Sequence, residues 1–275
     1  MWPTLITLWL ALSGNTPPRP APRRRPSYRP RLEALEDRAV PASLSYSTFL
    51  HGTVYGTAVD SAGDIYVTGQ TDSSLPTTPG ALQTSGSGAF VAKLNPTGTA
   101  LIYATYLGNG GDGGTGIAVD ASGDAYVLAE GGTVSTTANA ISSTPNSNDS
   151  TDFLAELNPT GSGLNYATYL PGTADGQYDT YSLAGAIAVD GSGNIYVDGT
   201  AGSGLPVTAG AFQTAPLGGG TNSGTDPFFM KINPALSGAA SIMYASYLGG
   251  SSGVDAATAI AVDGAGNAYL EGLTG

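Results

Sequence analysis

Few residues of this chain could do chemistry, and they are scattered. His51 is the only histidine, and the chain contains no cysteine. A multi-histidine metal site, thiolate ligands, disulfides and a cysteine nucleophile are therefore excluded within one chain. A serine-type triad would have to use His51, which stands in a His-Gly pair where related segments carry Gly-Gly. We interpret His51 as a substituted turn residue, and we predict no catalytic residues.

Two acidic runs gather oxygen ligands of the kind that calcium prefers. They are NSNDSTD (146–152) and ADGQYD (174–179), and their carboxylates are Asp149, Asp152, Asp175 and Asp179. Neither run has the ligand spacing, glycine and terminal glutamate of a dedicated calcium loop. The main interpretation is solvated loops without any cofactor, and structural Ca²⁺ is the alternative.

A glycine-rich run, GNGGDGGTG (108–116), contains G-x-G-x-x-G spacings. A dinucleotide-binding fingerprint requires a strand followed by a helix. This run lies between two strand-like segments, so we predict a flexible connecting loop.

Charge is divided unevenly along the chain. Residues 44–275 carry 18 acidic and two basic residues, a formal net charge of −16, and all seven arginines lie between Arg19 and Arg38. A body this acidic repels nucleic acid and anionic lipid. Nucleic-acid binding is therefore not expected, whereas basic partners are compatible with this charge.

One motif recurs four times, and it must be positioned by strands. Its copies are TAVDSAGDIYVTGQT (57–71), IAVDASGDAYVLAEG (117–131), IAVDGSGNIYVDGTA (187–201) and IAVDGAGNAYLEGLT (260–274). In each copy two short β runs flank an Asp-x-x-Gly turn, in which the aspartate bonds backbone amides and the glycine supplies a positive φ. The turn aspartates are Asp60, Asp120, Asp190 and Asp263.

Two further motifs follow the first three copies. One reads AFVAKLNPTG (89–98), DFLAELNPTG (152–161) and PFFMKINPAL (227–236), and the next reads LIYATYLG (101–108), LNYATYLP (164–171) and IMYASYLG (242–249). Each unit thus holds four strands, and its repeated tyrosines are expected to pack between units. An all-β fold of four-stranded antiparallel blades, a β-propeller, is predicted.

The combined motifs resemble the SBBP family of bacterial β-propeller repeats and, more distantly, NHL repeats. The resemblance covers residues 44–275 and implies an exported or cell-surface propeller, for which the family brings no agreed catalytic residues. The segment RLEALEDRAVPA (31–42) also resembles the L-E-x-L-E-x-R segment of surface proteins from planctomycete-type bacteria.

The predicted organisation is a disordered, Pro- and Arg-rich segment (1–43) followed by an incomplete propeller (44–275). The propeller divides into a leading strand 44–52, three full blades 57–108, 116–171 and 186–249, and a partial fourth blade 259–275. The apolar run from Trp2 to Leu12 is too short to span a membrane. It reads as a signal-peptide core or as the product of a misassigned start codon, since no basic residue precedes it. We expect the chain to be part of a longer propeller.

The sequence favours a secreted or cell-surface interaction module with a protein or glycan partner. An alternative is a propeller lyase or hydrolase, although the body holds one His, no Arg and two Lys. A second alternative is glycan binding through Tyr178 or Tyr181, in the long connection between the second and third units.

Overall fold

The computed structural model describes residues 50–145, 152–172, 185–217, 226–251 and 255–273. The chain divides into two units, 1–43 and 44–275, and every described residue belongs to the second. The described part is all-β: it holds fourteen strands and one 3₁₀ turn, η1 (Gly238–Ser241).

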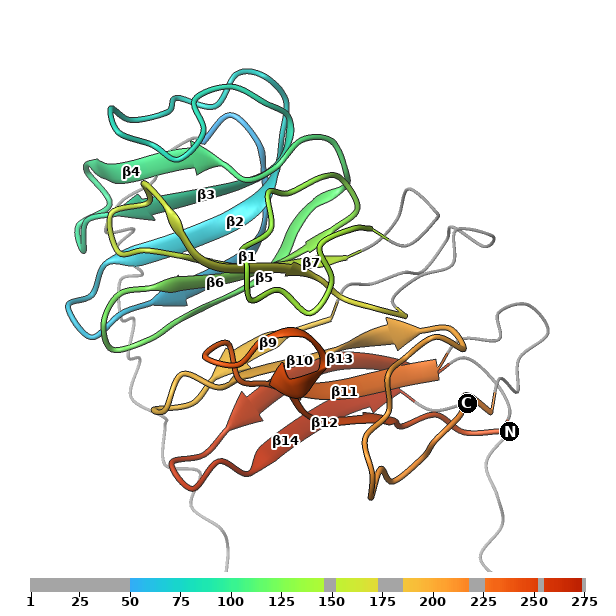
Figure 1. The fold of residues 1–275 in the computed structure, drawn as a ribbon. Coiled ribbons are helices and arrows are strands. Elements are labelled where there is room, and N and C mark those ends of the chain that lie inside the picture. The colour runs from blue at the N-terminus through green and yellow to red at the C-terminus, as the bar shows by residue number, and fades with distance from the viewer. Residues whose placement is uncertain (1–49, 146–151, 173–184, 218–225, 252–254, 274–275) are drawn as a thin grey trace, which may run out of the picture. The chain divides into compact units, whose positions relative to one another are not determined.

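Three sheets have four antiparallel strands each, hydrogen-bonded in chain order (Figure 1). The first contains β1 (Thr53–Val59), β2 (Ile65–Thr71), β3 (Gly88–Leu94) and β4 (Leu101–Tyr106). The second contains β5 (Gly113–Val119), β6 (Ala125–Glu130), β7 (Phe153–Leu157) and β8 (Leu164–Tyr169). The third contains β9 (Ile187–Val189), β10 (Ile195–Ala201), β11 (Asp226–Ile232) and β12 (Ile242–Tyr247).

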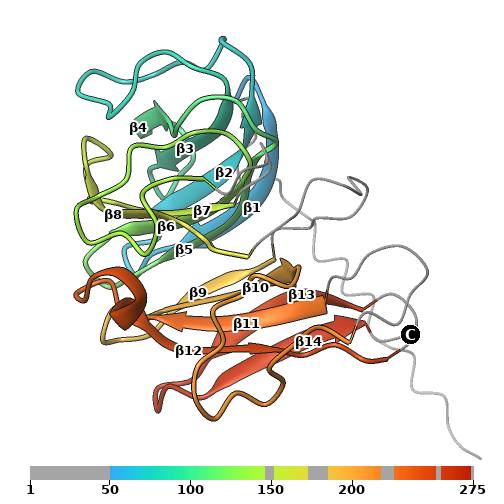
Figure 2. The ribbon, with the colours of Figure 1, turned by 45° about the vertical axis from the view of Figure 1, so that its right-hand side comes forward.

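A fourth sheet has two strands, β13 (Ala256–Val262) and β14 (Ala268–Leu273), seen beside the third sheet in Figure 2. The predicted all-β class and the four-stranded antiparallel unit are therefore confirmed. Among the described residues each sheet is open, with a linear strand order.

The copies share irregularities as well as strands. The first strand shifts register at Val54/Gly56, Gly114/Gly116 and Ala257/Ala259, and the third-to-fourth strand pairing shifts at Leu94, Leu157 and Ile232. A shift at the same repeat position in several copies marks a β-bulge that belongs to the unit.

The first strand of three sheets begins earlier than the sequence predicted. The first two units and the partial fourth were expected to start at 57, 116 and 259, whereas β1, β5 and β13 start at Thr53, Gly113 and Ala256. The bulge breaks the strict two-residue alternation from which the strand was recognised, so the residues before it were read as loop. The expected leading strand lies largely outside the described residues, and its last three residues, 50–52, are not in a strand.

The glycine-rich run is the clearest correction. Residues 113–116 are not loop but the beginning of β5, where Gly113 pairs with Glu130 and Gly114 with Ala129. Gly114 packs so closely on Thr68 of β2 that a side chain there would collide with the threonine hydroxyl. Glycine is needed here because a strand of the second sheet approaches a strand of the first.

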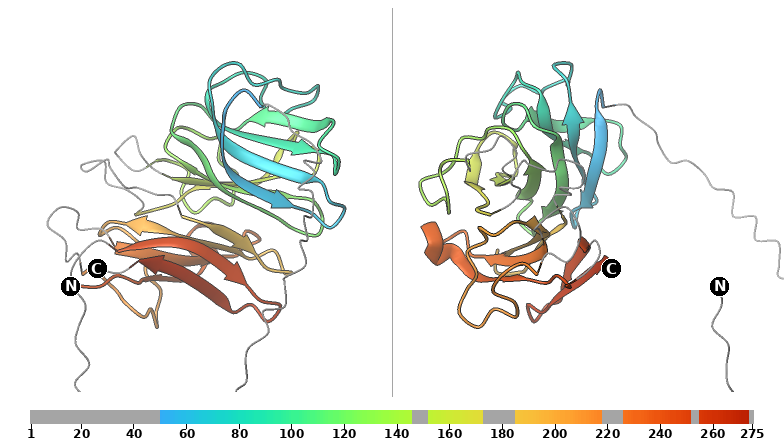
Figure 3. Two further views of the ribbon diagram at one scale, coloured as in Figure 1. Left: turned by 180° about the vertical axis from the view of Figure 1, so that it is seen from behind. Right: turned by 90° about the vertical axis from the view of Figure 1, so that its right-hand side faces the viewer.

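Figure 3 shows the sheets from two further directions. Two of the three apolar clusters of the core join successive sheets, and the third lies within the first sheet. One apolar cluster joins the first and second sheets and includes Tyr66, Ile117 and Leu157. Another joins the second and third and includes Leu128, Leu154 and Met230. The third strands are almost wholly buried, in keeping with sheets that are covered on both faces.

The repeated tyrosines have two different roles. The tyrosine of the second strand reaches the next sheet: the Tyr66 hydroxyl donates to the Gly123 carbonyl and that of Tyr196 to the Gly266 carbonyl, both at 3.3 Å. The last tyrosine of the fourth strand instead fixes the loop between its own second and third strands. Its hydroxyl accepts from Leu75 N in the first sheet, Val134 N in the second and Leu205 N in the third.

Candidate functional site

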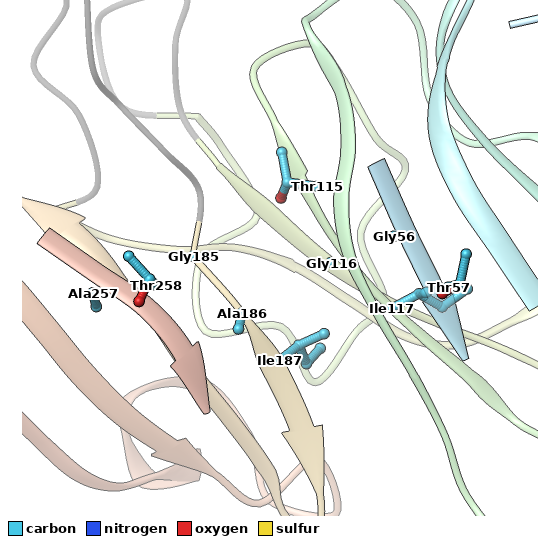
Figure 4. A pocket seen from close by; sticks show the side chains of 10 residues that line it. All are labelled: Gly56, Thr57, Thr115, Gly116, Ile117, Gly185, Ala186, Ile187, Ala257 and Thr258. Carbon is cyan, nitrogen blue, oxygen red and sulfur yellow. The ribbon is translucent and has the colours of Figure 1, made fainter. Parts of the chain in front are cut away.

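A cavity of about 340 Å³ lies where the first strands of the four sheets come together (Figure 4). β1 contacts β5, β5 contacts β9, and β9 contacts β13. The wall of the cavity consists of three threonines, three glycines and four apolar residues. These are Thr57, Thr115, Thr258, Gly56, Gly116, Gly185, Ile117, Ala186, Ile187 and Ala257.

The wall is polar only through hydroxyls and backbone. Thr115 and Thr258 occupy the bulges of β5 and β13, and each hydroxyl donates to a carbonyl of its own second strand, Leu128 O and Glu271 O, at 3.2 Å. Their hydrogens are thus already used, which leaves the threonine oxygens as acceptors. Such a wall suits a small neutral ligand or ordered water better than a charged substrate.

One ionisable side chain is attached to this wall. Asp198 of β10 is fully buried, and its Oδ1 accepts from the backbone N of Ala186, a cavity-lining residue. Its Oδ2 has no hydrogen-bond partner among the described residues. Burial raises the pKa of Asp198 to about 6, against the lowering effect of the Ala186 amide.

Sequence reasoning missed Asp198, although the repeat carried a signal. The equivalent positions in the other copies are Thr68, Leu128 and Glu271. In every copy this position is two residues after the second-strand tyrosine, with a valine or leucine between them. A carboxylate in a register position that alternation predicts to be buried is worth singling out.

The four turn aspartates act alike. In each turn Oδ1 accepts two backbone amides, those of the second and fourth residues after the aspartate, at 2.9–3.0 Å. The glycine of each turn has a φ between 77° and 85°. Oδ2 accepts the hydroxyl of the second-strand tyrosine, at 2.8–3.3 Å across the four copies.

A lysine completes this arrangement in the first and third sheets. Lys93 Nζ lies 3.3 Å from Asp60 Oδ2 and 3.0 Å from Asp64 Oδ2, and Lys231 Nζ lies 3.8 Å from Asp190 Oδ2. Each ammonium also stands 4.7 Å from the centroid of the neighbouring tyrosine ring. We call this arrangement of Asp, Tyr and Lys the turn triad.

The second sheet replaces the lysine with Glu156. This residue pairs with Tyr126 in register, as Lys93 pairs with Tyr66. Burial, and then the charges of Asp124 and Asp120, raise the pKa of Glu156, while a hydrogen bond from Asn165 opposes the shift. Asn165 Nδ2 lies 3.0 Å from Glu156 Oε1 and 2.8 Å from Asp124 Oδ1, and so donates toward both carboxyls.

Of the four calcium candidates, only Asp152 lies in the described part of the chain. Asp152 is buried just before β7, and burial, together with the charge of Glu130, raises its pKa well above the usual range. Asp149, Asp175, Asp179, Tyr178 and Tyr181 lie outside the described residues. Within the described ranges no group of three or more carboxylates or histidines is arranged to hold a metal ion.

His51 is exposed and lies in a bend before β1. Its backbone carbonyl accepts a hydrogen bond from the Thr71 hydroxyl at 2.6 Å. The described residues contain no helix that is long and apolar enough to cross a membrane.

No protein-family model matches the sequence, and no curated protein matches it significantly.

Proposed function

We propose that residues 44–275 form a non-catalytic β-propeller that serves as an interaction or scaffold module at the outside of a bacterial cell. The four-stranded sheets, the chain-order strand pairing and the adjacent first strands support blades arranged about a common cavity. The resemblance to SBBP repeats supports export and a longer propeller.

The use of ionisable side chains carries the non-catalytic part of this proposal. In the repeated turns the aspartates are held by backbone amides and tyrosine hydroxyls, and the two lysines are held by those aspartates. Groups engaged in this way hold strands and sheets together and are poor candidates for proton transfer. The cavity wall itself is built of neutral side chains.

Asp198 favours the alternative of a propeller enzyme, because a buried carboxyl with a pKa of about 6 is poised for acid–base work. Its side chain has no exposed surface, however, so a substrate in the cavity does not reach it in this structure. Glycan binding through Tyr178 and Tyr181 remains the second alternative.

A comparison of wild type with Asp198→Asn tests the proposal. Lyase and hydrolase activities against a polysaccharide panel should stay at the level of buffer for both proteins. Saturable binding on a glycan array or to an immobilised protein partner should be equal for both. Turnover that disappears in Asp198→Asn would refute the non-catalytic module, and glycan binding lost in Tyr178→Ala or Tyr181→Ala would establish the glycan alternative.

A further inference from the structure

Asp198 of β10 is a buried carboxyl of which only one oxygen has a partner. Its side chain has no exposed surface, and Oδ1 accepts from the backbone N of Ala186, whereas Oδ2 has no hydrogen-bond partner among the described residues. A buried carboxylate in this state is costly unless a donor or a positive charge compensates it. Oδ2 is therefore an acceptor that still requires a donor.

This carboxyl takes the place of a backbone acceptor at the start of β9. The Asp198 amide donates to the Ala186 carbonyl at 3.2 Å, as in an antiparallel pair, but the Ala186 amide donates back to the Asp198 side chain. The ladder between β9 and β10 accordingly ends at Ile187 and Val197, whereas the other first strands pair further, across their bulges. Ala186 is thus held to β10 by two hydrogen bonds that both involve Asp198.

Gly185 adapts the cavity wall to this carboxyl. A side chain at Gly185 would meet Asp198 Oδ1 at 2.0 Å, so the position requires glycine. The same bulge position holds Thr115 in the second sheet and Thr258 in the fourth, each hydrogen-bonded to its own second strand. In the third sheet the Asp198 carboxyl instead lies behind the backbone of Gly185 and Ala186, both of which line the cavity (Figure 4).

The described residues contain no lysine or arginine that is free to compensate Asp198. Residues 44–275 have no arginine and two lysines, Lys93 and Lys231. Both lysines are held by the aspartates of their turn triads. The single histidine, His51, is exposed in the bend before β1. A positive charge for the buried carboxyl must therefore come from outside the chain.

The elements packed on β10 leave the carboxyl without a charged neighbour. The Ala186 backbone faces it from the start of β9, Phe229 is its register partner in β11, and the cavity-lining residues of β13 are uncharged. Lys231, two residues after Phe229, is paired with Asp190. Burial, opposed by the Ala186 amide, raises the pKa of Asp198 to about 6, so the carboxyl is largely ionised at neutral pH.

We propose that Asp198 binds the ammonium group of a small aliphatic amine that occupies the cavity. The wall alone suits a neutral ligand, and the carboxyl behind it favours an ammonium. An ammonium supplies both the charge that Oδ2 lacks and donors for the oxygens of Thr115 and Thr258, whose own hydrogens are already used. The amine reaches Oδ2 when the stretch at Ala186 moves away from β10. The carboxyl and the stretch that covers it belong to the third sheet, so the proposal does not depend on how many units the propeller has.

Binding of propylamine to the full 275-residue protein tests the ligand class. Two controls separate its features: 1-propanol has a similar shape without the charge, and tetramethylammonium has the charge without N–H donors. Saturation-transfer NMR titrations at pH 8 in about 0.15 M salt, which screens the acidic surface, should show propylamine binding about tenfold tighter than either control. Equal affinity for propylamine and either control would overturn the ammonium assignment, and no binding of propylamine would overturn the site.

Asp198→Asn tests the location, because asparagine keeps an oxygen acceptor for the Ala186 amide and removes the charge. The preference for propylamine should fall to within about twofold in this variant and stay unchanged in the matched variant Asp190→Asn, whose carboxylate belongs to a turn triad of the same sheet. In the wild type the preference should also be lost at about pH 4, where Asp198 is protonated while the amine keeps its charge. A preference that survives Asp198→Asn, or that is the same at pH 4 and pH 8, would place the amine elsewhere and refute the proposal.

Discussion

Glu156→Lys should stabilise the protein, which is unusual for a charge reversal at a residue only 9% exposed. The variant gives the second sheet the turn triad of its neighbours. In the first sheet the lysine ammonium lies 3.3 Å and 3.0 Å from two carboxylates, at positions that correspond to Asp120 and Asp124. Glu156 instead adds a third carboxyl to that pair.

The magnitude follows from three kinds of change. Each of two like-charge contacts becomes an ion pair, and ion pairs of this type contribute about 0.2–1 kcal/mol, with repulsions of similar size removed. The hydrogen bond from Asn165 to Glu156 is lost, at a cost of about 1 kcal/mol. The sum is a gain of about 1.4 kcal/mol in the free energy of unfolding at pH 7 at the middle of these ranges and of about 3 kcal/mol at most, and Glu156→Gln should show roughly half of it because it removes repulsion without adding attraction.

The pH dependence of stability distinguishes an electrostatic gain in Glu156→Lys from a gain through better packing. Burial and neighbouring carboxylates raise the pKa values of Glu156 and Asp124 in the folded wild type, so their ionisation destabilises the fold as pH rises. As pH falls, Glu156 and Asp124 take up protons in the wild type, and the repulsion that the variant removes is lost there as well. The advantage of Glu156→Lys should therefore be largest near pH 7 and shrink as pH falls toward about 4.

Urea unfolding followed by circular dichroism at several pH values measures this difference. The mirror variant Lys93→Glu creates the same triple carboxyl in the first sheet and should lose about 1–3 kcal/mol at pH 7. A Glu156→Lys protein that is no more stable than wild type at pH 7, or whose advantage is the same at pH 4, would refute the electrostatic account.

Three further predictions concern the sheet contacts and the buried carboxyl. Because the folded-state pKa of Asp198 is about 6, wild-type stability should decline as pH rises from about 4 to 6. Asp198→Asn should remove this decline, so that in urea titrations it is about 3 kcal/mol more stable than wild type at pH 8 and about equal to it at pH 4. Tyr196→Phe should lower the free energy of unfolding by about 1–2 kcal/mol, and Tyr126→Phe by about half as much, because the Tyr196 hydroxyl also donates to Gly266 of the next sheet; equal losses would contradict an inter-sheet role. Gly114→Val should cost about 3 kcal/mol or more through its collision with Thr68, whereas Gly264→Ala, which meets open space, should change the melting temperature little.

The repeat made most of the fold predictable. Each Asp-x-x-Gly turn was recognised from residue type and spacing, since aspartate and glycine have distinct reasons to be there, and the strands on either side follow from alternation. Closure of the sheets into a propeller is not given by such local signals. It depends on contacts between units, and it stays a prediction.

The early part of the first strands could not be recognised because the cause is not local. Gly113 to Gly116 read as loop because glycine is disfavoured in strands, yet Gly114 is fixed by the approach of Thr68 from another sheet. Val54 takes the place of Gly114 in β1, where it is 41% exposed. The same strand position thus accepts valine or requires glycine according to what packs against it, which a single copy of the repeat does not reveal.

The candidate chemistry was hidden for the opposite reason, because the signal lies in differences between the copies. Motif recognition looks for what the units share, and what they share here is structural: the aspartate, the glycine and the tyrosine of each turn. The informative positions are those where a copy departs in charge while buried, as Glu156 departs from Lys93 and Lys231 and as Asp198 departs from Thr68 and Leu128, the fourth copy carrying an exposed Glu271 there. Burying a carboxyl costs free energy unless something compensates it, so such a departure persists only where the local surroundings or a function tolerate the cost. In a repeat protein the other copies are internal controls for that cost, because they show what the same register position holds when no carboxyl is buried there.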